Sequence, residues 1–395
     1  MKMNKLTVAI LIAMLLGIVT GQGYRLFAPT QAATFASDIT LLTDIFLRLI
    51  KMIIAPLVFT TLVVGIAKMG DTRTVGRIGA KTLGWFMLAS LMSLTLGLVM
   101  VHLMQPGVGL SLSLPDDGAS SGVLATAISL KDFVTHAIPK SVVEAMATNE
   151  ILQIVVFSLF FGLAAAALGD AAKPVVMLMA SAAEIMLKVT GYVMNFAPFA
   201  VFGAIAAMVA KEGLGILATY GTFMAQFYLA LACLWLLLIA MGSLFIRRRI
   251  LTLLAMIREP ILLAFSTASS EAAYPKTLDR LEKFGCDKRI ASFVLPMGYS
   301  FNLDGSMMYC TFAVMFIAQA YGIELSTAQQ ITMLLLLMVT SKGMAGVPRA
   351  SLVVIAATLN QFHIPEAGIL LLLGIDHFLD MGRSATNVLG NAIAA

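Results

Sequence analysis

Several uninterrupted apolar runs, each about as long as a bilayer is thick, constrain this chain more than any other feature. They cover about residues 6–27, 41–67, 82–104, 151–169, 174–210 and 215–246. A helix of roughly 20 apolar residues crosses a hydrocarbon core about 30 Å thick. Charged residues make up 12% of the chain, about half the share found in soluble domains. Both observations predict an all-α polytopic membrane protein, with residues 1–395 forming a single membrane body, and argue against an ordinary soluble enzyme.

The basic residues are distributed along the chain in a way that predicts its orientation. They flank the apolar runs at Lys2, Lys5, Arg73, Arg77, Lys81, Lys173, Arg247, Arg248, Arg249, Lys276, Arg280, Lys283, Lys288 and Arg289. Cytoplasmic loops of membrane proteins are enriched in lysine and arginine. We therefore expect both termini to be cytoplasmic, in a bacterial-type inner (plasma) membrane. Orientation then explains the net charge of +5 better than a nucleic-acid surface does, because each cluster lies at the end of an apolar run.

From about residue 250 the apolar pattern changes, because polar and glycine-rich segments interrupt it at mid-length. The run at 261–265 leads into a polar stretch at 266–271 and then back to a basic segment. This order predicts a helical hairpin that enters from the cytoplasm and returns to it. The run at 290–321 is broken near residues 302–306, and a second hairpin is expected to turn at 341–348.

The order of these elements is a hairpin, a broken helix, a second hairpin and then a polar helix from about Glu366. It indicates one unit repeated in opposite orientation, which is typical of secondary transporters with a site near the midplane. A passive channel is an alternative, and saturable, gradient-driven accumulation would separate a symporter from it. An intramembrane hydrolase with Ser269 or Ser270 as nucleophile is disfavoured, because neither serine lies in a GxSxG motif and the chain has no HExxH motif.

The last helix carries five polar side chains on one face. They are Asp376, Asp380, Arg383, Asn387 and Asn391, which at about 100° per residue fall within a sector roughly 80° wide. A charge at the centre of a membrane helix costs about 2.5–3.5 kcal/mol, so this face should line a protein interior, a cavity or a ligand. Arg383 suits a carboxylate and Asp380 an ammonium, which together match an acidic amino acid. The alternative is an internal Asp380–Arg383 ion pair that only holds helices together.

The break at 302–306 supplies oxygen atoms at membrane depth. Asn302 and Asp304 carry the hard oxygen ligands that small cations prefer, although Asn-x-Asp-Gly also occurs in surface turns. The chain has no GxxxxGK[ST] phosphate loop, so we expect no ATP and no cofactor, only co-transported H+ and/or Na+. A singly negative substrate entering against an inside-negative potential is opposed by about 2.3 kcal/mol per 100 mV, so its accumulation requires at least two cations.

Four motifs resemble the dicarboxylate/amino acid:cation symporter family, the family of the glutamate and aspartate transporters. They are Ser-Ser-Glu at 269–271, Gly-Tyr-Ser-Phe-Asn-Leu-Asp-Gly-Ser at 298–306, Gly-Met-Ala-Gly-Val-Pro at 343–348, and Asp-Met-Gly-Arg at 380–383 with Asn387. The resemblance extends over essentially the whole chain. It implies a homotrimer in membrane lipids, with eight transmembrane helices and two re-entrant helical hairpins per protomer. It also implies an elevator-type mechanism, in which a transport domain at about 78–104 and 211–395 slides against a scaffold at about 1–70 and 105–210.

The resemblance also implies roles for single residues in substrate binding. Asp380 would bind the amino group and Arg383 the side-chain carboxylate, and the main-chain carboxylate would lie against Asn387 and the backbone around Ser270 and Val347. Further positions that match substrate contacts are Ser269, Ser306 and Ser384. These roles predict import of glutamate or aspartate. A C4-dicarboxylate symporter is the alternative, because that branch shares the first-hairpin and broken-helix motifs, whereas a neutral amino acid would leave Arg383 unpaired.

Cation sites also follow from the resemblance. One matches Gly298, Asn302, Asn387 and Asn391, another matches Asn302, Asp304, Ser90, Ala89 and Phe86, and a third is built from backbone near Ser341. Sodium-coupled members carry Asp, Thr and Tyr where this chain has Asn391, Ala89 and Phe86, so each difference removes an oxygen ligand or a charge. We therefore hypothesise that protons replace some or all of the sodium. The candidate proton carriers are Glu271, Asp304, Asp376 and His377, with a buried packing role as the alternative for His377.

Overall fold

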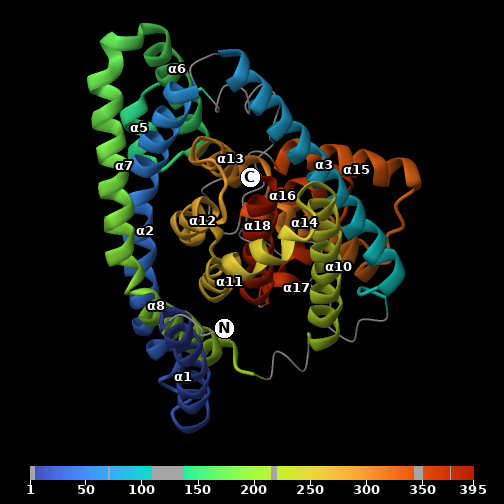
Figure 1. Ribbon diagram of the computed structural model, residues 1–395. Helices are drawn as coiled ribbons and strands as arrows, with labels where there is room; N and C mark the ends of the chain where they lie inside the picture. The colour runs from blue at the N-terminus through green and yellow to red at the C-terminus, as the bar shows by residue number, and fades with distance from the viewer. Residues whose placement is uncertain (1–4, 70–71, 109–137, 215–219, 342–349, 374) are drawn as a thin grey trace.

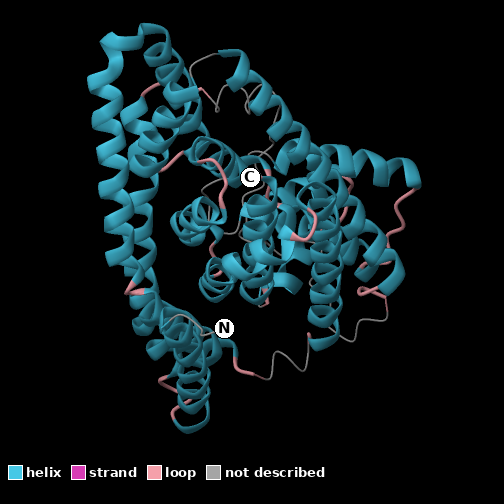
Figure 2. Cartoon of the chain, viewed as in Figure 1, coloured by secondary structure: helices cyan, strands magenta, loops and turns pink. Residues whose placement is uncertain are grey.

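The computed structural model describes residues 5–69, 72–108, 138–214, 220–341, 350–373 and 375–395. Within these ranges every regular element is a helix (Figure 2). Seven helical segments there are long and apolar enough to cross a membrane. The prediction of an all-helical chain with multiple candidate spans is therefore confirmed for the part that the structure describes.

Each of the six apolar runs forms helix. The helices are α1 (Lys5–Phe27), α2 (Ala32–Met69), α3 (Thr72–Met104), α6 (Ile151–Leu168), α7 (Lys173–Met194), α8 (Ala197–Glu212) and α10 (Gly221–Ile246). The run predicted at 174–210 divides into α7 and α8, because Pro198 lies in the first turn of α8 and has no N–H to continue the preceding helix. Between these elements lie the short helix α5 (Val142–Thr148) and the 3-10 turn η1 (Gly169–Ala172).

The first predicted hairpin consists of α11 (Arg249–Thr267) and α12 (Ser270–Phe284), which pack against each other. Ala268 ends α11 in a left-handed conformation with φ 49°. The Ser269 hydroxyl then accepts a hydrogen bond of 3.3 Å from the Ala272 N–H and caps α12. A polar capping residue directly after a left-handed residue places the turn within 266–271, as predicted.

The predicted break at 302–306 separates α13 (Lys288–Phe301) from α14 (Asp304–Ala320). Asn302 and Leu303 have non-helical backbone angles between the two helices. Backbone groups freed at membrane depth need protein or ligand partners, because lipid offers none. The break is therefore placed where its polar groups are surrounded by protein, and Asn302 and Asp304 are both fully buried.

The second predicted hairpin comprises α15 (Thr327–Thr340) and α16 (Ala350–Gln361), and its turn at 342–349 lies outside the described residues. The next elements are the 3-10 turn η3 (Glu366–Ile369), α17 (Leu370–Leu373) and α18 (Asp376–Ala394). The expectation of one polar helix from about Glu366 was wrong at its start. The chain after Pro365 first forms a 3-10 turn, and the polar helix begins only at Asp376.

The helices pack in two groups, which Figure 1 shows on the left and right of the view. In one group α2 packs against α6, α7 and α8, and α1 packs against α8. In the other α14 packs against α3, α16 and α18, while α18 also contacts α10 and α11. Helices α12 and α13 contact both α2 and α18. Because neighbouring helices surround α18, its polar face points into protein.

Candidate functional site

The polar stripe predicted on the last helix is buried. Only 1–3% of Asp376, Arg383 and Asn387 is exposed, and Asn391 is fully buried. Asp380 differs, because 33% of its side chain is exposed. The stripe therefore consists of enclosed polar groups with one acidic side chain at an accessible position.

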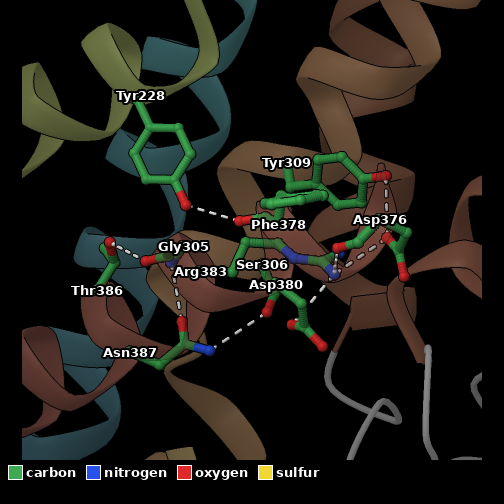
Figure 3. A network of polar contacts seen from close by, with 11 residues as sticks. Tyr228, Gly305, Ser306, Tyr309, Asp376, Phe378, Asp380, Arg383, Thr386 and Asn387 are labelled. Carbon is green, nitrogen blue, oxygen red and sulfur yellow. Dashed lines mark hydrogen bonds and ion pairs between the residues drawn. The ribbon is translucent and has the colours of Figure 1, made fainter. Parts of the chain in front are cut away.

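The Arg383 guanidinium lies between two carboxylates and an aromatic ring (Figure 3). Its Nη2 atom is 3.1 Å from Asp376 Oδ1 and 3.1 Å from Asp380 Oδ1. Its Cζ atom lies 4.1 Å from the centroid of the Tyr309 ring, which is a cation–π contact. Nε and Nη1 are buried and have no hydrogen-bond partner in the described part of the chain. The internal Asp380–Arg383 ion pair therefore forms, while these two guanidinium nitrogens keep hydrogen-bonding capacity that the described residues do not use.

Tyr309 is a member of this site that the sequence did not reveal. Its hydroxyl donates a hydrogen bond of 3.2 Å to Asp376 Oδ1, the atom that also accepts from Arg383. Tyr309 is fully buried on α14. It lies three residues after Ser306, so both side chains lie on one face of that helix. Helical spacing from the polar break is the one sequence signal that could have identified it.

Asn387 connects α18 to the start of α14. Its Oδ1 accepts a hydrogen bond of 2.9 Å from the Gly305 N–H, and its Nδ2 donates one of 3.2 Å to the Ser306 hydroxyl. Gly305 permits this approach, because a Cβ there would lie 2.6 Å from the Arg383 carbonyl oxygen. Ser306 and Ser384 are both largely buried beside these groups. The predicted substrate residues thus form two pairs, Asp380 with Arg383 and Asn387 with Ser306, which meet where Gly305 packs against the Arg383 backbone.

A second cluster surrounds the break in the α13–α14 helix pair. Asn302 Nδ2 donates hydrogen bonds of 3.0 Å to Asp304 Oδ2 and 3.1 Å to Asn391 Oδ1. Its Oδ1 is buried without a hydrogen-bond partner in the described residues. Gly298 leaves the space that the Asn391 amide occupies, since a Cβ at 298 would overlap Asn391 Oδ1. Four predicted cation-site residues, Gly298, Asn302, Asp304 and Asn391, therefore lie together.

Helix α3 contributes Ser93 to this cluster, which the sequence reasoning missed. Ser93 Oγ lies 3.3 Å from Asp304 Oδ1 and 2.8 Å from the Ala89 carbonyl oxygen. Of the predicted residues on α3, Phe86 and Ala89 are buried and have no side-chain oxygen, and the Ser90 hydroxyl donates to the Phe86 carbonyl. Ser93 lies one helical turn beyond Ala89, so spacing on one helix face could have indicated it.

The remaining predicted residues lie at the ends of α12, α15 and α18 or beyond the described chain. The Ser269 hydroxyl caps α12, with Ser270 next to it in the first turn. Glu271 is half-buried and interacts electrostatically with Lys51 on α2. Ser341 is buried at the end of α15, and His377 is half-buried in the first turn of α18. Val347 lies outside the described residues.

Comparisons with known proteins agree over nearly the full chain. The pattern of the Sodium:dicarboxylate symporter family matches residues 6–395. A proton/sodium-glutamate symport protein of Bacillus caldotenax is 42% identical over 392 residues, which is 98% of this chain and 92% of that protein. A C4-dicarboxylate transport protein of Laribacter hongkongensis is 40% identical over 98% of this chain and 87% of that protein. A proton/glutamate-aspartate symporter of Bacillus subtilis is 38% identical over 98% of this chain and 92% of that protein.

Proposed function

Because the chain belongs to the sodium:dicarboxylate symporter family, we propose that it imports an acidic amino acid, aspartate or glutamate, together with cations. Membership makes it a multi-pass membrane transporter and not an enzyme. It is a cation-coupled symporter of glutamate and aspartate or of C4-dicarboxylates, and its relatives carry names of both kinds. The choice between the two substrate classes rests on the chemistry of α18.

The observation that carries the amino-acid proposal is the ion pair between Asp380 and Arg383. A substrate carboxylate that binds the guanidinium competes with Asp380 for it. An amino acid brings an ammonium that re-pairs the displaced Asp380, so each charge keeps a partner. A C4-dicarboxylate brings no cation, and an uncompensated carboxylate at membrane depth is costly. The ion pair thus favours a substrate with two carboxylates and one ammonium.

A C4-dicarboxylate is the second candidate, because the relative from Laribacter hongkongensis bears that name at 40% identity. Such a substrate would still engage Arg383, whose Nε and Nη1 have no hydrogen-bond partner among the described residues. It would require a proton or another cation at Asp380 to replace the ammonium.

The coupling ions in this proposal are H+ and/or Na+. Asn302, Asp304 and Asn391 supply amide and carboxylate oxygens beside the helix break, which suits a small hard cation. Phe86 and Ala89 supply no side-chain oxygen at that cluster. Fewer oxygen ligands favour the binding of fewer sodium ions, so protons would supply part of the coupling. Glu271, Asp304, Asp376 and His377 remain the predicted proton carriers.

The transport mechanism proposed is an elevator. Helices α1, α2, α6, α7 and α8 would form the scaffold, and α3 and α10 to α18 the moving domain, with α12 and α13 along the boundary between them. Eight spans, two re-entrant hairpins, a homotrimer and cytoplasmic termini belong to the same proposal.

Uptake into proteoliposomes tests this function. Labelled aspartate, glutamate and succinate are each offered under separately imposed sodium and pH gradients. The proposal expects gradient-driven accumulation of the amino acids. In Asp380→Ala it expects loss of aspartate uptake, without a loss of whatever succinate uptake the wild-type protein has. Asp170→Asn is a matched control, because that carboxylate is 91% exposed and pairs only locally with Lys173. Unchanged aspartate uptake in Asp380→Ala would refute the proposed role of Asp380 in binding the ammonium. Uptake that depends on the sodium gradient and not on the pH gradient would refute coupling to protons.

A further inference from the structure

Two residues besides Asp380 hold the Arg383 guanidinium in place, and neither has yet been given a role in substrate binding. Asp376 Oδ1 accepts from Arg383 Nη2 at 3.1 Å and from the Tyr309 hydroxyl at 3.2 Å. The Tyr309 ring lies 4.1 Å from the guanidinium carbon. Figure 3 shows the two side chains converging on the arginine from α14 and from the start of α18. We call this arrangement of Tyr309, Asp376 and Arg383 the arginine clamp.

The clamp removes the freedom that an arginine side chain ordinarily has. An unrestrained arginine has several rotatable bonds, and its charged head adapts to ligands of different length. Here the head is fixed by a charge-assisted hydrogen bond, by a cation–π contact and by near-complete burial, since Arg383 is only 1% exposed. Asp380 lies three residues earlier on the same helix. The clamp therefore fixes the position of the Arg383 guanidinium, which would bind a carboxylate, relative to Asp380, which would bind an ammonium.

We propose that Tyr309 and Asp376 are positioning residues that determine substrate specificity, because the clamp sets the length of acidic amino acid that fits between Arg383 and Asp380. This inference rests on the function proposed above for those two residues. Aspartate and glutamate differ by one methylene, and a fitted pocket distinguishes one methylene by about 10- to 200-fold. A guanidinium released from the clamp follows the longer or the shorter carboxylate, so discrimination is lost before binding is.

Two substitutions separate the parts of the clamp. Tyr309→Phe keeps the ring over the guanidinium and removes only the hydroxyl that orients Asp376. Asp376→Asn keeps the shape of the side chain and removes the charge that holds Nη2. Tyr228→Phe is the matched control: its hydroxyl donates a hydrogen bond of 2.6 Å to the Phe378 carbonyl oxygen from α10, so the variant loses a similar hydrogen bond beside the site without touching the clamp.

The test compares KM for aspartate and for glutamate in proteoliposomes under one fixed driving force, with each Kd measured by calorimetry in detergent. We expect the wild-type protein to distinguish the two amino acids. Both clamp variants should reduce the ratio of the higher KM to the lower KM by about tenfold. Tyr228→Phe should keep the wild-type ratio. A variant that is only damaged in folding lowers the amount of active protein for both substrates and leaves the ratio unchanged.

The outcomes distinguish the two proposals. Wild-type transport of both amino acids with an unchanged ratio in Tyr309→Phe and Asp376→Asn would overturn the clamp as a specificity device and leave the proposed function standing. A wild-type ratio near one would do the same. Absence of binding and uptake of either amino acid by the wild-type protein would overturn both proposals.

Discussion

The Asp304 carboxylate lies against the bare Cα of Gly390, so that a Cβ at position 390 would overlap Oδ2 and lie 3.1 Å from Cγ. The same Cβ would lie 3.4 Å from Asn302 Nδ2. The absence of a side chain at Gly390 therefore lets the Asp304 and Asn302 side chains pack directly against the backbone of α18.

Gly390→Ala should displace Asp304 from Asn302 and lower gradient-driven uptake. A misplacement of about 1 Å in a preorganised site costs roughly 100-fold, and we expect a loss of at least about tenfold here. Gly84→Ala on α3 is the matched control, because a Cβ there meets nothing within 4 Å. Uptake per inserted protein is the measurement. Full uptake by Gly390→Ala would place Asp304 outside the transport machinery.

Glu259 holds the two arms of the first hairpin together. It is 4% exposed on α11, lies 3.1 Å from Lys276 Nζ, and also pairs with Arg280, both on α12. Glu259→Gln leaves two partly buried cations without their counter-charge. Breaking a buried pair costs about 3–5 kcal/mol, so a marked fall in unfolding temperature in detergent is expected.

Asp279→Asn provides the comparison for Glu259→Gln. It breaks a solvent-exposed pair with Lys283 on the same hairpin arm, and such pairs contribute about 0.3–0.5 kcal/mol. Equal unfolding temperatures for the two variants would show that Glu259 is not a structural link.

Ala268 is an unusual residue for the left-handed position that ends α11, where its φ is 49°. A residue with a Cβ pays about 1–2 kcal/mol for this conformation, and glycine does not. Ala268→Gly should therefore stabilise the protein by about 1 kcal/mol, visible as a higher unfolding temperature. Ala255→Gly, in the interior of the same helix, should destabilise it by about 0.5–1 kcal/mol. The two glycine substitutions moving in the same direction would contradict this interpretation.

Asp287 gives a pH prediction at the turn between α12 and α13. Hydrogen bonds from the Arg289 side chain and N–H hold the pKa of Asp287 below its ordinary value. A lowered pKa in the folded state stabilises the fold above the unfolded value of about 3.9, and this stability is lost as pH falls through the folded pKa. The contribution is below about 1 kcal/mol, because the pair is exposed. Unfolding of wild type and Asp287→Asn, compared from pH 6 down to about 3, should converge at the acid end. A constant difference in stability between the two proteins over this pH range would contradict the prediction.

Much of this architecture could be predicted from the sequence, because bilayer thickness and helical periodicity dominate it. The apolar runs became helices, the chain broke at Asn302, and the stripe from Asp376 to Asn391 faces protein. Each of these follows from a pattern that length or spacing alone produces. The division between α7 and α8 was also encoded, in Pro198, but the apolar composition around it concealed the interruption.

The two site residues that the sequence reasoning did not identify were missed for a common physical reason. Tyr309 lies in an apolar stretch of α14 and Ser93 among small and apolar residues of α3, so neither carries a signal in its own neighbourhood. Both acquire roles through contacts with residues far away in the chain, Asp376 for Tyr309 and Asp304 for Ser93. Such pairings depend on how helices pack, which a single sequence does not specify.

A symporter that accumulates its substrate must also return without cargo. In this protein the Arg383 guanidinium then keeps two carboxylate neighbours, Asp376 and Asp380. On the function proposed above, an arriving substrate would exchange one carboxylate neighbour of Arg383 for another and would not create an ion pair where none existed. The loaded and unloaded forms would then expose no bare guanidinium to low-dielectric surroundings, and neither leg of the cycle would be blocked by an isolated positive charge.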